Sequence, residues 1–148
     1  VKRVVAGAPV WVGDAREILQ KEEMFDAVLA DLPCTGLGAL RRRPEVRWRR
    51  NISDLRSLIQ LQSEISDAAI SVLNIGGVFG YATCSPHMAE TSIAVADILR
   101  RHPLLEQIDV TPYLPGNLEG AVRQGAMALW TQRHNMDSMF LALFRKTA

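Results

Sequence analysis

The sequence predicts an α/β fold in which strands alternate with helices around a single sheet. Two observations carry this prediction. Short apolar runs that end at glycine, proline or aspartate recur along the chain, and segments with helical periodicity lie between them. The 148 residues are also the length of one domain, and 48% of them are hydrophobic, which is enough for a core. We expect one domain, residues 1–148, whose sheet is mostly parallel and becomes antiparallel at one edge.

The first predicted elements are short. Val10–Val12 lies between a proline and a glycine and is predicted to be a strand, followed by a helical turn at Ala15–Leu19. Phe25–Ala30 is almost entirely apolar, which is typical of a strand buried on both faces of a parallel sheet. These segments begin the alternation of strand and helix.

A long helix is predicted next. Ser53 can cap it, and Asp54 falls in the first turn, where the helix dipole favours a carboxylate. Apolar residues then recur at three- and four-residue spacing, which gives the helix one core-facing stripe. The stripe consists of Leu55, Leu58, Leu61, Ile65, Ala68, Ala69 and Val72. Gly76 and Gly77 are predicted to end the helix.

The second half continues the pattern. Ser85 is a suitable N-cap and Pro86 a suitable first helical residue, so a helix is expected from there to about residue 101. Strands are expected around it, and the last two should form an antiparallel hairpin. Their ranges are Val78–Thr83, residues 106–111, Ala126–Trp130 and Met139–Phe144.

Candidate catalytic residues lie where the predicted strands end, which is where open α/β sheets bind ligands. Asp14 follows the first strand, Asp31 and Cys34 follow the second, and Cys84 follows Val78–Thr83. If the strands that precede Cys34 and Cys84 are neighbours in the sheet, their exits lie about 5 Å apart. A free cysteine is often only a small buried hydrophobe, and an aspartate can be a solvated loop residue. Two cysteines at adjacent exits, one of them at a predicted helix N-terminus that lowers thiol pKa, favour thiol chemistry instead.

A basic segment follows the first cysteine. Six of the 14 arginines lie within residues 41–50, although the formal net charge of the chain is only +1. Arginines around a tryptophan suit phosphate contacts and base stacking, whereas the plainer interpretation is a solvated loop. Its position beside a candidate catalytic loop favours a nucleic-acid contact. The residues in question are Arg41, Arg42, Arg43, Arg47, Trp48, Arg49 and Arg50.

The composition excludes several other classes. Two cysteines are too few for a disulfide framework or a four-thiolate zinc site, so no metal is expected. The apolar stretches are too short to span a membrane, and no secretion leader is recognisable. We therefore expect a cytoplasmic protein.

Two segments resemble a known family. Asp31–Trp48, with the sequence DLPCTGLGALRRRPEVRW, closely resembles motif IV of the Sun/Fmu (RsmB-type) RNA 5-methylcytosine methyltransferases. Tyr81–Ser85, with the sequence YATCS, resembles their motif VI. Gly76–Gly77, Glu90 and the late segment Arg133–Phe140 also resemble features of that family. The resemblance covers essentially the whole chain.

The resemblance implies a Rossmann-like class I methyltransferase sheet that uses S-adenosylmethionine. It implies that Cys84 adds to carbon 6 of a cytosine, so that carbon 5 can attack the methyl group of the cofactor. Cys34 would assist loss of the carbon 5 proton and release of the enzyme. Asp31 would lie near the cytosine edge and the reactive end of the cofactor, and Asp14 near its adenine or ribose. The implied substrate is RNA, in bacterial members usually ribosomal RNA.

One feature of the family is missing. A glycine-rich cofactor loop should follow the first strand of such a sheet, but no such turn precedes Asp14. We interpret the chain as the C-terminal part of a catalytic domain that is truncated before that loop. Two strands are then missing that would lie at the centre of the sheet, in space between Val10–Val12 and Phe25–Ala30. The exposed sheet edge is expected to make the isolated chain dimerise or pair with a neighbour. We also expect the isolated chain to bind the cofactor weakly or not at all and to be inactive.

Two other functions are compatible with parts of the sequence. A cysteine hydrolase would use Cys84 with His87 or His134 as its base, but it gives no role to Cys34 or to the arginines. A non-catalytic RNA-binding module would use only residues 41–50 and would need no cysteine.

Overall fold

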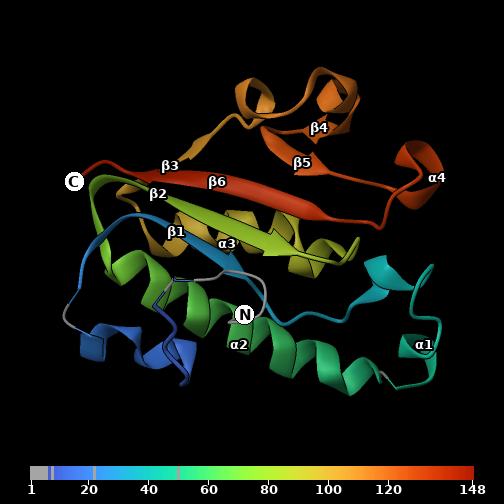
Figure 1. Ribbon diagram of the computed structural model, residues 1–148, viewed down its shortest axis with the longest axis horizontal. Coiled ribbons are helices and arrows are strands. Elements are labelled where there is room, and N and C mark those ends of the chain that lie inside the picture. The colour runs from blue at the N-terminus through green and yellow to red at the C-terminus, as the bar shows by residue number, and fades with distance from the viewer. Residues whose placement is uncertain (1–6, 8, 22, 50) are drawn as a thin grey trace.

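The computed structural model describes residues 7, 9–21, 23–49 and 51–148, which form a mixed sheet with helices packed alongside it (Figure 1). The sheet has six strands in the order β1-β2-β6-β5-β4, and β3 also pairs with β6. The strands are β1 Phe25–Asp31, β2 Leu73–Thr83, β3 Leu105–Ile108, β4 Val122–Arg123, β5 Ala126–Ala128 and β6 Phe140–Lys146. The α/β class expected from the sequence is therefore confirmed.

The helical elements include two long helices, α2 Ile52–Ser71 and α3 Ser92–Arg101. Both contribute to one core with the face of the sheet that carries Phe79 and Tyr81. Neither they nor the short helices among the described residues are long and apolar enough to cross a membrane. The short helical segments are η1 Ala15–Lys21, η2 Leu37–Ala39, α1 Val46–Arg49, η3 Met88–Glu90, η4 Thr111–Tyr113, η5 Gly116–Ala121 and α4 Thr131–His134.

The pair β1 and β2 supplies the parallel part of the sheet. Their register places Val28 opposite Phe79 and Asp31 opposite Ala82, so both strands reach the same edge together. The strand at Phe25–Ala30 is confirmed, but its expected burial on both faces is wrong, because Leu29 is 71% exposed. From Val28 to Asp31, β1 alternates between half-buried and exposed side chains, as in a strand that is covered on one face only.

The expectation of a mostly parallel sheet is also wrong. β6 lies between β2 and β5, and it runs antiparallel to both of them and to β3. The closing hairpin is confirmed, since β5 and β6 pair across the α4 turn, although β5 ends at Ala128. The strand expected at residues 106–111 is β3, and it begins and ends earlier than expected.

Val10–Val12 is not a strand. Val12 is 89% exposed, and none of these three residues belongs to a described strand pair. A strand forms only where a neighbour completes its hydrogen-bond ladder, and the described residues place no strand on the outer side of β1. The outer edge of β1 is therefore unpaired within the described part of the chain. The expected dimer through this edge stays a prediction.

The boundaries of α2 differ from those expected. Asn51 rather than Ser53 is the N-cap, and the Asp54 carboxylate accepts a hydrogen bond from the Asn51 backbone N–H at 2.9 Å. The helix ends at Ser71 and not at the glycines, since the Val72 carbonyl already accepts from the Phe25 N–H. Pairing with β1 thus begins before the chain reaches Gly76–Gly77.

The helix expected from Pro86 begins later. His87 caps the short η3 turn through its Nδ1, which accepts a hydrogen bond from the Ala89 backbone N–H at 3.1 Å. The backbone at Thr91 then leaves the helical conformation, with φ of −134° and ψ of −104°, and α3 begins at Ser92. Cys84 therefore does not lie at a helix N-terminus.

Candidate active site

Two cysteines meet at the end of the parallel strand pair. Cys34 follows β1 and Cys84 follows β2, and their Sγ atoms lie 3.2 Å apart. The Leu32 backbone N–H donates to the Ala82 carbonyl at 3.0 Å, which continues the ladder up to this point. The two residues are 50 apart in sequence, so the register of the parallel pair brings them together. The expectation that both strand exits are adjacent is confirmed.

The two sulfurs have different acidities. The hydrogen bond from Cys34 is the largest cause that lowers the pKa of Cys84, to about 7, while burial and the charges of Asp31 and Glu90 oppose it. The same hydrogen bond and the burial of Cys34 raise the pKa of that thiol. Cys84 is accordingly the more acidic of the two thiols, and above pH 7 its thiolate accepts the hydrogen bond that Cys34 donates. The low pKa expected from a helix N-terminus is therefore produced by a neighbouring thiol instead.

One glycine connects the two loops to a third segment. The Gly38 backbone N–H donates to the Cys84 carbonyl at 2.9 Å, and the Gly38 carbonyl accepts from the Ser138 N–H at 2.9 Å. A Cβ atom at this position would clash with the Ser138 carbonyl oxygen and would lie 2.8 Å from that of Cys84. Only glycine fits this close approach of three backbone segments.

Polar side chains form a buried cluster behind the sulfurs. Thr35 and Gln62 are each hydrogen-bonded to Glu90, and all three side chains are buried. Tyr81 donates to Gln62 Oε1 at 3.1 Å and reaches this cluster from β2. Sequence reasoning assigned no role to Thr35 or Gln62 and identified Glu90 only as a family-like feature. Three residues so far apart in sequence carry no spacing signal that would have found them.

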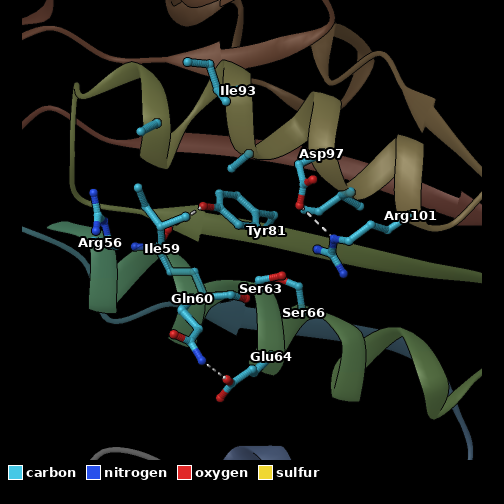
Figure 2. A pocket seen from close by; sticks show the side chains of 14 residues that line it. Arg56, Ile59, Gln60, Ser63, Glu64, Ser66, Tyr81, Ile93, Asp97 and Arg101 are labelled. Carbon is cyan, nitrogen blue, oxygen red and sulfur yellow. Dashed lines mark hydrogen bonds and ion pairs between the residues drawn. The ribbon is translucent and has the colours of Figure 1, made fainter.

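A cleft of about 460 Å³ lies between α2 and α3, beyond this cluster (Figure 2). Figure 2 shows Tyr81 pointing into the space between the helices, with Asp97 and Arg101 joined by an ion pair on α3. Neither cysteine is among the described residues that line the cleft. It is therefore at the back of the site, away from the sulfurs.

A second cavity, of about 620 Å³, runs along β1 and is lined by residues that include Trp11, Ile18 and Asp31. Its volume is in the range of small-molecule sites. Asp31 thus lines a cavity next to the cysteine loop, and its expected place at the reactive end of the cofactor stays a prediction. Asp14 is not among the described lining residues, and its carboxylate is ion-paired with Arg16 at 2.6 Å. That pair lowers the Asp14 pKa to about 2.

The arginine segment divides into two parts. Arg41 donates to the Asn135 carbonyl at 2.6 Å, and Arg42 Nε donates to the Asp137 carboxylate at 2.7 Å. These two side chains attach the segment to the turn before β6. The side chains beyond them point into solvent, and Trp48 is 82% exposed. All described arginines of the segment are exposed, Arg41 and Arg42 included. The members beyond that attached pair are Arg43, Arg47, Trp48 and Arg49, whereas Arg50 lies outside the described residues.

The described residues offer no support for the alternative chemistries. No group of three or more metal-ligating side chains is present among them. His87 Nδ1 accepts from Ala89, and His134 Nδ1 accepts from the Trp130 N–H at 2.9 Å. Neither of these two histidines has a hydrogen bond to Cys84 among the described residues. A hydrolase would require a base at that sulfur.

Comparison with known proteins gives a consistent assignment. The family model of the 16S rRNA methyltransferases RsmB/F matches residues 2–145. This chain belongs to the RsmB/F methyltransferase family. A Mycobacterium tuberculosis protein named as a methyltransferase is 52% identical over 122 residues, which are 82% of this chain and 26% of that protein. The ribosomal RNA small subunit methyltransferase B of Escherichia coli O6:K15:H31 is 42% identical over 82% of this chain and 29% of its own length.

Solved structures support the fold of this RsmB/F family member. The structure of PH0851 is 34% identical in sequence and has a TM-score of 0.72. The match covers 82% of this chain and 26% of the PH0851 chain. The structure of NSun6 from Pyrococcus horikoshii, solved with SFG, is 24% identical in sequence and has a TM-score of 0.81. The match covers 97% of this chain and 36% of the NSun6 chain. The sheet is accordingly a Rossmann-like methyltransferase sheet. The chain spans about a quarter of the length of the curated relatives that it matches.

Proposed function

We propose that this chain carries the reactive centre of an S-adenosylmethionine-dependent RNA cytosine-C5 methyltransferase that acts on ribosomal RNA. The observation that supports it most directly is the cysteine pair, with Sγ atoms 3.2 Å apart and a Cys84 pKa of about 7. Addition to carbon 6 of a cytosine requires a thiolate, and a second thiol beside it can manage the proton that carbon 5 must lose. Membership of the RsmB/F family supports the RNA substrate.

The different acidities of the cysteines assign their parts. The Cys84 thiolate attacks carbon 6 and forms a thioether bond, which makes carbon 5 nucleophilic. S-adenosylmethionine supplies the methyl group that carbon 5 takes up. Once Cys84 is bonded to carbon, it carries no negative charge, so the main cause that keeps Cys34 protonated disappears. Cys34 can then release its proton to solvent and act as a base.

The last step restores both sulfurs. Cys34 takes the carbon 5 proton, and the electrons of that bond expel Cys84 as a thiolate while the carbon 5–carbon 6 double bond reforms. Cys34 ends as the thiol with which it began, and one proton has been released to solvent overall. The 3.2 Å distance between the two sulfurs supports this sequence of steps, because it places the second thiol beside the one that is bonded to the base.

The residues that line the cavity along β1 suit the cofactor. Its apolar wall includes Trp11 and Ile18, and Asp31 and Pro33 line it beside the cysteine loop. We propose that Asp31 lies at the end of the cavity where the cytosine edge and the methyl donor meet. Asp14 could approach an adenine or ribose only if its pair with Arg16 opened, so its cofactor role stays a prediction.

For the RNA, the exposed end of the arginine segment is the proposed contact. Arg43, Arg47 and Arg49 present guanidinium groups for phosphates, and Trp48 offers a face on which a base can stack. Arg47 lies over the Trp48 ring at 5.6 Å, which keeps the two groups together. Arg41 and Arg42, which the sequence placed in the same set, are occupied by the turn before β6 and act by holding the loop.

Trapping the covalent intermediate tests the function. The intact protein is incubated with ribosomal RNA and S-adenosylmethionine, and adducts are detected on a denaturing gel. The Cys34→Ala variant should accumulate a protein–RNA adduct, because it can add to cytosine but cannot complete release. The Cys84→Ala variant should form none.

Ser71→Ala is the matched control, because its hydroxyl bonds, within the described part of the chain, to the Ala68 carbonyl of its own helix alone. It should turn over without accumulating adduct. Absence of an adduct with Cys34→Ala, in a protein that still binds RNA, would contradict the proposed function. Unchanged RNA affinity in both cysteine variants, with no adduct in either, would favour a binding module.

A further inference from the structure

Glu90 is a buried charged residue to which the proposed mechanism gives no part. Its side chain is 0% exposed, although it belongs to the short η3 turn. Burying a carboxylate so completely is costly unless donors surround it. Three do so: the Thr35 backbone N–H at 2.8 Å, the Thr35 hydroxyl at 2.6 Å and the Gln62 amide at 3.0 Å.

The donors connect Glu90 to the backbone on both sides of Cys34. Two of the three belong to Thr35, which directly follows that cysteine. Gln62 reaches the other side, because its Nε2 also donates to the Pro33 carbonyl at 2.9 Å. The carboxylate therefore fixes the loop that carries Cys34 at two neighbouring points.

The same residue is also connected to both sides of Cys84. The Glu90 carbonyl accepts from the Thr83 hydroxyl at 3.1 Å, and Thr83 directly precedes Cys84. On the other side, the Ser85 hydroxyl lies 3.2 Å from the hydroxyl of Thr35, which is itself bonded to the carboxylate. All residues adjacent to the two cysteines thus belong to one network with Glu90 at its centre.

We propose that Glu90 is a positioning residue of the two-cysteine site, which holds both loops so that Cys34 can donate its hydrogen bond to Cys84. The inference rests on the proposed function, in which Cys84 is the nucleophile. Glu90 acts through Thr35, Gln62 and the backbone, since no described hydrogen bond joins its carboxylate to either sulfur.

Glu90 affects Cys84 in two opposite directions, and this makes the role measurable. Holding Cys34 in place secures the hydrogen bond that lowers the Cys84 pKa. The negative charges of Glu90 and of Asp31, the other charged group that faces Cys84, raise that pKa. Glu90→Ala removes the stronger, geometric effect, so the Cys84 pKa should rise. Glu90→Gln keeps the size and an acceptor for Thr35 but removes the charge, so the Cys84 pKa should stay constant or fall slightly.

The test measures the alkylation rate of Cys84 by iodoacetamide against pH in the intact protein, with the modified peptide identified by mass spectrometry. We expect a midpoint near pH 7 for the unchanged protein and for Glu90→Gln. For Glu90→Ala, we expect the midpoint to rise by about one pH unit or more, toward the ordinary value of a cysteine. Ser66→Ala is the matched control, since it removes a buried hydroxyl of the same region that bonds, among the described residues, to the Gln62 carbonyl alone. It should leave the midpoint near pH 7.

A second variant covers the case in which Glu90→Ala does not fold. Thr35→Val removes only the hydroxyl bonded to the carboxylate and should raise the midpoint by a smaller amount. If Thr35→Val and any folded Glu90→Ala protein titrate like Ser66→Ala, the proposal is wrong. Because the assay reads the thiol and needs no RNA, its result is independent of methyl transfer. A shifted midpoint without any RNA adduct would refute the proposed function and leave the positioning role intact.

Discussion

The loop that carries Cys34 and the arginine segment that follows it are neighbours in sequence and opposites in structure. Cys34 is 6% exposed, and the residues on both sides of it are hydrogen-bonded to a buried carboxylate network. Trp48, in the arginine segment, is 82% exposed, and the arginines around it point into solvent. One region is fixed and shielded, whereas the other is open.

The difference reflects what each region has to do. The pKa of a thiol can be set only where its neighbours are held at fixed distances and water is partly excluded. A contact with RNA phosphates and bases requires side chains that a large polymer can reach. Arg41 and Arg42 lie at the boundary, because their ion pair and hydrogen bonds attach the open segment to the turn before β6.

Gly38→Ala should break the fixed region with the largest effect. A Cβ atom would force apart the Cys84 and Ser138 backbone segments. We expect a loss of about 1–3 kcal/mol in the free energy of unfolding. We also expect methyl transfer to fall by about 100-fold, because small displacements of reacting groups are costly.

Gly120→Ala is the control for this substitution, since a Cβ atom there meets nothing within 4 Å. Chemical denaturation and single-turnover methylation would provide the two measurements. Equal behaviour of the two alanine variants would show that the close approach at Gly38 does not position Cys84.

The pH dependence sharpens the description of the fixed region. Cys84 reacts as the thiolate and has a pKa of about 7, so methyl transfer should be lost as the pH falls through that value. Between pH 6 and pH 8 the thiolate fraction, and with it the single-turnover rate, should rise by roughly tenfold. A rate that is flat or falls over this interval would contradict Cys84 as the ionised nucleophile.

The smallest expected effect separates the two parts of the arginine segment. Arg49→Gln should weaken RNA binding a few-fold and reduce the slope of log affinity against log salt by about 0.7, as for one lost phosphate contact on a single strand. Arg41→Gln should instead lower the thermal stability and leave the salt slope almost unchanged, because its guanidinium is bonded to Asn135. Equal slopes for the two variants, measured by salt titration, would remove the distinction.

Some features of the site follow from the sequence because they are local or depend on a simple register. The apolar run at Phe25–Ala30 identifies β1, and the run at Val78–Thr83 identifies most of β2. Parallel neighbours end at one edge, so Cys34 and Cys84 could be expected to meet. Their distance in space is then set by the pairing of the two strands and not by the number of residues between them.

Other features could not be predicted, since they depend on partners that are far away in sequence. Val10–Val12 has a strand-like composition but no partner strand in the described residues, so it forms no strand. Ser85 and Pro86 are typical of a helix start, but the structure has only the short η3 turn after them, capped by His87. The non-helical backbone at Thr91 separates that turn from α3. The lowered pKa of Cys84 comes from Cys34 and not from a helix.

The sequence by itself determined the α/β class, the two strand exits that carry cysteines and the family to which the chain belongs. Composition and motif spacing are sufficient to predict these features, since each depends on residues that are close together in the sequence. The tertiary structure alone decided which cysteine is the more acidic, which arginines are attached to the turn before β6 and which buried carboxylate connects the loops. Those properties arise from distances between segments that the chain separates by tens of residues, and only packing brings such groups within reach of a hydrogen bond.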